Sequence, residues 1–197
     1  MRKVTFGGAN SLDNFIARKN DAVDWLMWNK EVAVIMKDFW KTIDTMVMGR
    51  RTYEVAMKSF GGDSVSYPGV TTYVFSRTLT KKHRAPKGVN IISEDAAEFV
   101  SKLKNEKGKD ICVMGGGVLA RSLFEAGLID EIGFNIHPVL LGSGIPLFLE
   151  MTKQIDLELV KCQELKNGCV MLTYRVKHSA RKGNHKRHKR SPKKGTK

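Results

Sequence analysis

Three consecutive glycines, Gly115 to Gly117, stand between two apolar runs in the segment DICVMGGGVL, residues 110–119. Glycine weakens strands and helices alike, so a group of three needs a physical reason. A backbone without side chains lets a ligand approach closely, and the free N–H groups at the start of a helix attract anions. We therefore interpret the segment as a diphosphate-binding loop, with a tight strand-to-helix turn as the alternative. Its spacing matches neither GxGxxG nor the P-loop pattern.

Two further segments combine arginine with hydroxyl groups at the ends of predicted strands. MGRRTYE (48–54) has two arginines at the start of a predicted helix, where positive charge opposes the helix dipole unless an anion binds. VFSRT (74–78) carries a guanidinium between two hydroxyl groups, which suits phosphate. Each segment alone could be an exposed charged turn, but together they favour a ligand with several phosphates, such as a dinucleotide. The residues concerned are Gly49, Arg50, Arg51, Thr52, Ser76, Arg77 and Thr78.

The elements that must position these residues alternate along the chain between β-rich runs and amphipathic segments. The alternation predicts an α/β fold: a single, mostly parallel, twisted sheet with flanking helices and a C-terminal antiparallel hairpin turned at Asn167-Gly168. Ligands of such sheets bind beyond the carboxyl ends of the strands, where the three segments lie. Strands are predicted at 4–9, 45–49, 70–76, 89–93, 111–114, 131–140, 157–165 and 169–177, and helices at 30–42, 51–60, 93–107 and 118–127.

The formal net charge of +14 comes mostly from the C-terminal end. Residues 177–197 contain 10 of the 34 Lys and Arg residues and no acidic residue, which leaves 24 basic and 20 acidic residues in the rest of the chain. We therefore expect one folded domain over 1–177 and a basic, disordered tail over 178–197, since the tail has no large apolar side chain to bury. The tail could bind nucleic acid or another anionic surface, or act as a solubilising extension.

Other features exclude several classes of protein. No run of about 18 apolar residues is present, so no membrane span is expected, and the N-terminus lacks the apolar core of a secretory signal. The three cysteines, Cys112, Cys162 and Cys169, have no metal-binding spacing. We expect them to be free thiols in a cytoplasmic protein without a metal site.

Residues 2–177 resemble the dihydrofolate reductase-like fold and, within it, the reductase family typified by the C-terminal half of the bifunctional deaminase–reductase of riboflavin biosynthesis. Four motifs carry the resemblance in order: SLDNFIA, MGRRTYE, VFSRT, and GGGVLARSLFEAGLIDEI followed by HPVLLGSGIPLF. SLDNFIA (11–17) departs from the family pattern at Asn14, where glycine is usual. The four motifs are specific together, although none would be specific alone.

The resemblance implies NADPH as the cofactor. The glycine loop would lie against the diphosphate, the clusters of arginine and hydroxyl groups near the adenosine phosphates, and Ala9 and Ile16 beside the nicotinamide. The implied cofactor-binding residues are Ala9, Ile16, Gly49, Arg50, Arg51, Thr52, Ser76, Arg77, Thr78, Gly115, Gly116, Gly117, Val118 and Leu119.

The substrate side matches the family less well. Dihydrofolate reductases carry an acid on the first helix, where this chain offers only Glu31 and Asp38 nearby, and Met114 stands where riboflavin-pathway reductases typically have an acid. Asp13 matches the family's substrate-facing aspartate and is predicted to act in catalysis, with a solvated loop aspartate as the alternative. The candidate substrate-side residues are Asp13, Met114, Trp25 and Trp28. The two tryptophans would form a wall of the pocket beside the nicotinamide.

These features predict an NADPH-dependent reductase that transfers hydride to a C=N or C=O group of a small heterocyclic or sugar-linked substrate. By resemblance the default substrate is 5-amino-6-(5-phosphoribosylamino)uracil, and a dihydrofolate reductase is the alternative. A nucleic-acid-associated protein acting through its basic tail is the alternative of another class. His137 is interpreted as a hydrogen-bonded structural residue rather than a proton donor. The oligomeric state is left open, with a homodimer among the options.

Overall fold

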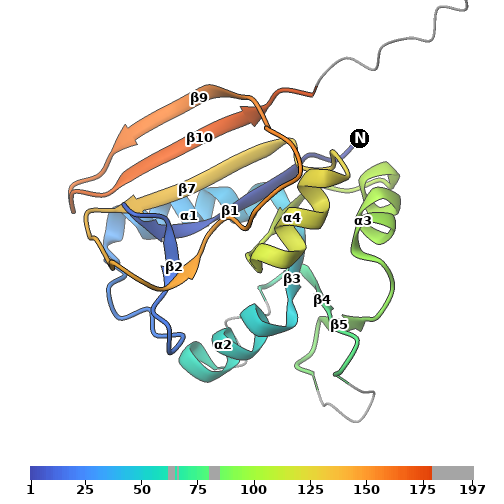
Figure 1. The fold of residues 1–197 in the computed structure, drawn as a ribbon. Helices are drawn as coiled ribbons and strands as arrows, with labels where there is room; N and C mark the ends of the chain where they lie inside the picture. The colour runs from blue at the N-terminus through green and yellow to red at the C-terminus, as the bar shows by residue number, and fades with distance from the viewer. Residues whose placement is uncertain (62–64, 66, 80–84, 179–197) are drawn as a thin grey trace, which may run out of the picture.

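The computed structural model describes residues 1–61, 65, 67–79 and 85–178, with a twisted sheet between helices (Figure 1). The strands of the large sheet are β1 (Val4–Ser11), β3 (Ile43–Gly49), β4 (Thr71–Phe75), β5 (Val89–Ile92), β6 (Asp110–Val113), β7 (Glu131–His137), β9 (Leu157–Glu164) and β10 (Val170–Val176). The helices are α1 (Lys30–Thr42), α2 (Arg50–Phe60), α3 (Ala96–Asn105) and α4 (Gly117–Glu125).

Over the described residues, eight strands form this sheet in the order β5-β4-β3-β6-β1-β7-β10-β9. The strands from β5 to β7 in this order pair in parallel, whereas β10 pairs antiparallel with both β7 and β9. The predicted fold, a mostly parallel sheet with flanking helices and a C-terminal hairpin, is therefore confirmed. Because the parallel strands point the same way, their carboxyl ends lie along one edge of the sheet.

The structure adds a small sheet that the sequence pattern does not predict. It is an antiparallel pair of β2 (Phe15–Ala17) and β8 (Ile145–Pro146). Strands of three and two residues are too short to reveal a period of two. The predicted strand 131–140 also ends early, at His137, because the next residue is a proline, which cannot donate to a strand ladder.

Apolar clusters fix helices on the two faces of the sheet. On one face, Phe6 of β1 and Phe134 of β7 pack in a cluster with Val100 of α3 and Leu123 of α4. On the other face lies α1, which Figure 1 draws behind β1 and β7. Val32 of α1 packs there against the hairpin of β9 and β10. The strand ends between these layers stay uncovered, and this is where the motifs lie.

The C-terminal hairpin turns at the predicted position. Gly168 has a φ of +82°, which favours glycine, and its N–H donates to the carbonyl oxygen of Leu165 at 2.9 Å. The predicted disordered tail begins at His178, the last residue before the undescribed end of the chain. Residues 179–197 lie outside the described residues.

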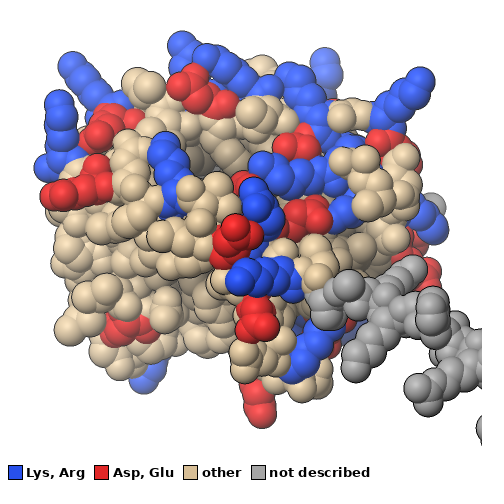
Figure 2. All heavy atoms as spheres, turned by 90° about the horizontal axis from the view of Figure 1, so that it is seen from above, with Lys and Arg blue, Asp and Glu red and all other residues tan. Residues whose placement is uncertain are grey.

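Basic and acidic side chains are interspersed on the face of the folded part drawn in Figure 2. This mixture agrees with the small excess of basic residues before residue 177. Among the described helices, none is long and apolar enough to cross a membrane.

Candidate functional site

A cleft with a volume of about 2220 Å³ runs along the carboxyl ends of the parallel strands. It extends from Ser76 after β4, across Gly49 and Gly116 at the ends of β3 and β6, to Ala9 in β1 and Asn135 in β7. Every residue that the sequence assigns to cofactor binding, from Ala9 to Leu119, lines this cleft. The fold thus brings together motifs that are far apart in the sequence.

Two helices begin in the middle of the cleft without a capping side chain. The N-cap residues of α2 and α4 are Gly49 and Gly116, and within the described chain neither helix has a side-chain cap. Neither has an acid in its first turn. By contrast, the side chains of Asn29 and Asp95 cap α1 and α3. The first N–H groups of α2 and α4 are therefore available to an anion.

Each glycine of the loop has a reason within the chain. Gly115 and Gly116 have φ values of +82° and +91°, which favour glycine, and a Cβ on Gly116 would lie 3.4 Å from the Gly49 nitrogen. A Cβ on Gly117 would lie 3.0 Å from Cγ of Leu149. Ligand approach is therefore not needed to explain all three glycines. The contact with Gly49 nevertheless places the starts of α2 and α4 side by side.

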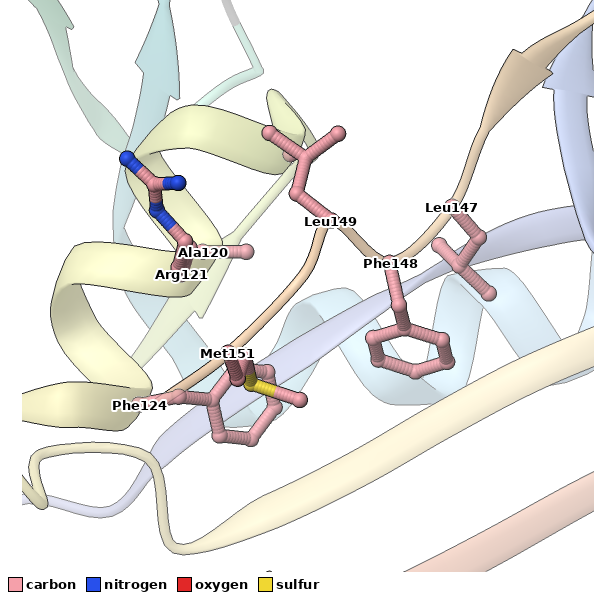
Figure 3. Close-up of a pocket in the computed structure, with 8 residues that line it drawn as sticks. Ala120, Arg121, Phe124, Leu147, Phe148, Leu149 and Met151 are labelled. Atoms are coloured by element: carbon pink, nitrogen blue, oxygen red, sulfur yellow. The ribbon is translucent and has the colours of Figure 1, made fainter. Parts of the chain in front are cut away.

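A second, smaller hollow lies beside α4 (Figure 3). It has no room for even a water-sized ligand. Apolar side chains fill it, so it acts as packing that fixes the start of α4. Its lining is Gly117, Ala120, Arg121, Phe124, Leu147, Phe148, Leu149 and Met151.

The arginines of the cleft differ in their partners. Arg50 pairs with Glu54 one turn further along α2, with 2.9 Å between nitrogen and oxygen. Arg51 pairs with Asp21, in the loop between β2 and α1, at 2.8 Å. Arg77 is exposed, and no described acid pairs with it. All three guanidinium groups are accessible, so a phosphate in the cleft can reach them.

The hydroxyl groups are partly used by the chain itself. The Ser76 hydroxyl oxygen accepts hydrogen bonds from the backbone N–H groups of Thr78 and Leu79 at 3.2 and 2.9 Å, and so shapes the turn after β4. The Thr52 side chain lies under the glycine loop, 3.6 Å from where a Cβ of Gly115 would be. Thr78 is exposed in the cleft.

The side chain of Asp13 is hydrogen-bonded to neighbouring residues. It does not appear among the described residues that line the cleft. Its carboxylate accepts hydrogen bonds from the Ser11 hydroxyl at 2.6 Å and from the N–H groups of Leu141 and Gly142 at 3.1 and 2.8 Å. The bond from Ser11 is the largest cause of the lowered pKa of Asp13. These contacts hold the loop after β7 against the turn that follows β1, and a catalytic role for Asp13 stays a prediction.

The two candidate wall tryptophans lie in different places. Trp28 is 70% exposed and lines the cleft, as does Met114. Trp25 is buried and does not line it; its ring meets that of His137 edge to face, with centroids 5.2 Å apart. Trp25 therefore packs behind His137, which lines the cleft.

The carboxylates of α1 face away from the cleft. Glu31 accepts a hydrogen bond from the backbone N–H of Lys166, and Asp38 pairs with Lys41 on the surface. The side of α1 that lines the cleft is mostly apolar. Its members include Val32, Ile35, Met36, Phe39 and Trp40.

Sequence reasoning did not select Asn135 on β7. Ile132 and Phe134 belong to the core, and the alternate positions Gly133, Asn135 and His137 line the cleft together with Phe134. A strand with small or polar residues at every second position, close to a glycine loop, was the available signal.

Comparisons with known proteins agree with this geometry. Two Bacillus subtilis (strain 168) proteins are similar: the uncharacterized protein YyaP, 32% identical over 182 residues (88% of this chain, 94% of that protein), and the uncharacterized protein YwjB, 38% identical over 162 residues (80% and 89%). A putative riboflavin biosynthesis protein from Shewanella sp. PV-4 matches with a TM-score of 0.74 and 27% identity, covering 90% of this chain and 100% of that one. Dihydrofolate reductase from Enterococcus faecalis, complexed with NADP(H), matches in fold with a TM-score of 0.62 and 20% identity, covering 89% and 97%.

The chain has the dihydrofolate reductase-like fold, with a cleft at the strand ends. The model of the RibD C-terminal domain matches residues 2–171, and the chain belongs to this family. The family is of the riboflavin-pathway reductase type. The resemblance inferred from the motifs is thereby confirmed.

Proposed function

We propose that the protein is an NADPH-dependent reductase of a small heterocyclic or sugar-linked substrate. The observation that carries this proposal is the pair of uncapped helix N-termini at Gly49 and Gly116, with arginines beside them, in a cleft that continues over β1 and β7. N–H donors and positive charge at adjacent strand ends suit a dinucleotide diphosphate. The bound NADP(H) of the E. faecalis enzyme supports the same choice of cofactor.

The cleft residues divide into three groups along the strand ends. The backbone at 115–119 and the start of α2 would bind the diphosphate, and Ser76 to Thr78 the phosphate on the adenosine side. Ala9 and Ile16 would contact the nicotinamide, which supplies the hydride when the cofactor is bound. The contribution of the chain is to hold both reactants in contact and to exclude water between them.

The substrate that we propose carries a C=N or C=O group, and 5-amino-6-(5-phosphoribosylamino)uracil is the family default. Dihydrofolate is a weaker candidate, because the carboxylates of α1 face the surface and leave an apolar helix side over the cleft.

Tryptophan fluorescence during titration with NADPH, repeated with NADH, tests the cofactor. Trp28 and Trp40 line the cleft and would report binding. We expect NADPH to bind at least about tenfold more tightly, because a charged hydrogen bond is worth roughly 1.5–3 kcal/mol. Arg77→Gln should remove most of this preference, whereas Arg175→Gln, at an exposed position of β10, should not. Equal affinity of the wild type for both nucleotides would contradict the proposal.

We further propose that the protein works in the cytoplasm. All three cysteines are free. Burial raises the pKa of the Cys112 thiol to about 12, and burial also raises the pKa of Cys169, so both remain unreactive thiols. Free thiols are typical of reducing compartments. Mass spectrometry of the protein isolated under alkylating conditions should find all three cysteines alkylated after unfolding.

A further inference from the structure

The amide of Asn135 is an unusual group on the floor of the cleft. Asn135 is 7% exposed, lines the cleft, and is paired in register with Ala9 on one side and Met171 on the other. One end of its amide lies 3.2 Å from Nε2 of His137. The other end has no hydrogen-bond partner among the described residues. Buried polar atoms are nearly always paired, so the free end needs an explanation.

The partners of His137 decide which end of the amide is free. The backbone N–H of Met27 donates to Nδ1 of His137 at 3.2 Å, so Nδ1 carries no proton. Burial lowers the pKa of His137, which keeps the ring neutral with its single proton on Nε2.

The proton on Nε2 requires an acceptor. If Nδ2 of Asn135 faced His137, two donors would meet and the carbonyl oxygen would stay unpaired. The amide's two ends have nearly the same shape, so the network selects the orientation in which Oδ1 accepts from Nε2–H. The NH₂ group is then the free end, and it is a hydrogen-bond donor. The Cys169 thiol, 3.5 Å from Nδ1, completes the buried cluster.

The strand beside Asn135 leaves room for a flat ring. Gly133 lies two residues earlier on the same side of β7 and pairs with Gly7 of β1. A Cβ on Gly133 would meet only Cγ2 of Thr5, at 3.9 Å. The space beside the Gly133 backbone, on the strand that carries Asn135, is therefore open to a flat ligand.

The acids that line the described cleft are all engaged by other groups. A ligand that must be protonated in order to bind would need a free carboxylate, as in a pair between an aminopyrimidine and an acid. The cleft instead offers an unpaired amide donor to a neutral ring. The engaged acids are Asp21 with Arg51, Asp24 with Arg18, Glu131 with Lys3, Glu94 with Lys102, and Asp95 as the cap of α3.

We propose that Asn135 is a substrate-recognition residue whose NH₂ group donates to a carbonyl oxygen of a neutral, lactam-type ring. His137 is the positioning residue, because the proton on its Nε2 sets the orientation of the Asn135 amide. The inference rests on the proposed function and adds to it the donor, its orientation and the class of ring edge that it selects. It explains why a buried amide is left half unpaired at the side of the cleft that faces Ala9.

The test compares two ring probes on the full-length protein saturated with NADP⁺. Diaminouracil presents two carbonyl oxygens, and tetraaminopyrimidine replaces both with amino groups. Isothermal titration should give the wild type about a tenfold preference for diaminouracil, the effect expected for one donor that gains or loses an acceptor. Asn135→Asp replaces the free donor with an acceptor and should shift the preference by about tenfold or more toward tetraaminopyrimidine. Asn105→Asp, on the exposed end of α3, is the matched control and should change neither affinity.

The outcomes separate this inference from the proposed function. Failure of the wild type to bind either NADP⁺ or NADPH would overturn the proposed function and, with it, this inference. If the nucleotide binds but both probes bind equally to the wild type, the inference alone is overturned, whether or not any variant folds. An equal loss of both probes in a folded Asn135→Asp protein would assign Asn135 a purely structural role and overturn it too.

The role of His137 has its own measurement. Nitrogen-15 spectra of the imidazole should give a protonated Nε2 and an unprotonated Nδ1 at about pH 7 to 8, with Nε2 shifting when diaminouracil binds. A proton on Nδ1 would reverse the orientation of the amide and overturn the proposed polarity.

Discussion

Arg51, in the first turn of α2, and Asp21, in the loop between β2 and α1, form an ion pair of 2.8 Å beside the cleft. Both residues line the cleft, and Asp21 has a φ of +67°. The pair thus links this loop to the helix that we propose binds phosphate. Because a phosphate would compete with the carboxylate for the same guanidinium, the pair should weaken cofactor binding.

Replacing Asp21 by Asn should therefore strengthen NADPH binding by about threefold, the scale of an exposed ion pair. Asn tolerates a positive φ well, so the loop should keep its conformation. Fluorescence titrations at low and high salt measure the effect, which should shrink as salt screens the pair. Asp24→Asn is the matched control, since Asp24 pairs with Arg18 within the loop. Weaker NADPH binding by Asp21→Asn would mean that the pair helps to hold the cofactor in place.

The contact between Gly117 and Leu149 makes a prediction about stability. Gly117→Ala puts a methyl group 3.0 Å from Cγ of Leu149, and such overpacking should lower the free energy of unfolding by roughly 1–2 kcal/mol. In a Leu149→Ala background the same change should cost little, because the space is then open. Urea unfolding of the four proteins of this cycle gives the coupling energy. Additive effects would contradict the packing reason for Gly117.

Much of the fold was predictable because its signals are local. The predicted helix 30–42 matches α1 to the residue, and Asn-Gly marks the hairpin turn. The pair β2 and β8 was not predictable, since its strands are too short for a pattern and meet only through the tertiary fold. Strand order is likewise a property of long-range pairing, which no window of sequence contains.

The candidate site divides in the same way. That the glycine and arginine segments meet in one cleft was predictable, because such residues at strand-to-helix junctions are visible in a linear motif; phosphate binding by these segments stays a prediction. The orientation that we propose for the Asn135 amide depends on His137, which accepts a hydrogen bond from the backbone of Met27, 110 residues away in the chain. Asp13 illustrates the converse, since its motif suggests a substrate contact while its hydrogen bonds are to Ser11, Leu141 and Gly142.

The C-terminal tail carries a prediction of its own, since its residues from 179 onward lie outside the described part. Deleting residues 179–197 should leave the melting temperature and the NADPH affinity unchanged, because the segment has no large apolar side chain to dock. Thermal unfolding and fluorescence titration of the two proteins test this. If the tail binds nucleic acid, the affinity of the full chain should fall steeply with salt and show little sequence preference. A marked drop in melting temperature on deletion would show that the tail packs on the domain.

The effect of pH on the loop that Asp13 holds can distinguish a structural role of Asp13 from a catalytic one. Its pKa is lowered in the folded protein, chiefly by the hydrogen bond from Ser11. A carboxyl with a lowered pKa stabilises the fold above its unfolded pKa of about 4, and this contribution is lost as the pH falls through the folded value.

Hydrogen exchange should therefore find the N–H groups of Leu141 and Gly142 protected at about pH 6 and progressively less protected below about pH 4. Asp13→Ala should abolish their protection at both pH values while NADPH affinity stays the same, because Asp13 lies outside the cleft lining. Asp38→Ala, which removes a surface carboxylate of α1, is the matched control and should leave the loop protected. If Asp13→Ala instead lowers turnover while the loop stays protected, Asp13 acts on the substrate as its motif predicts.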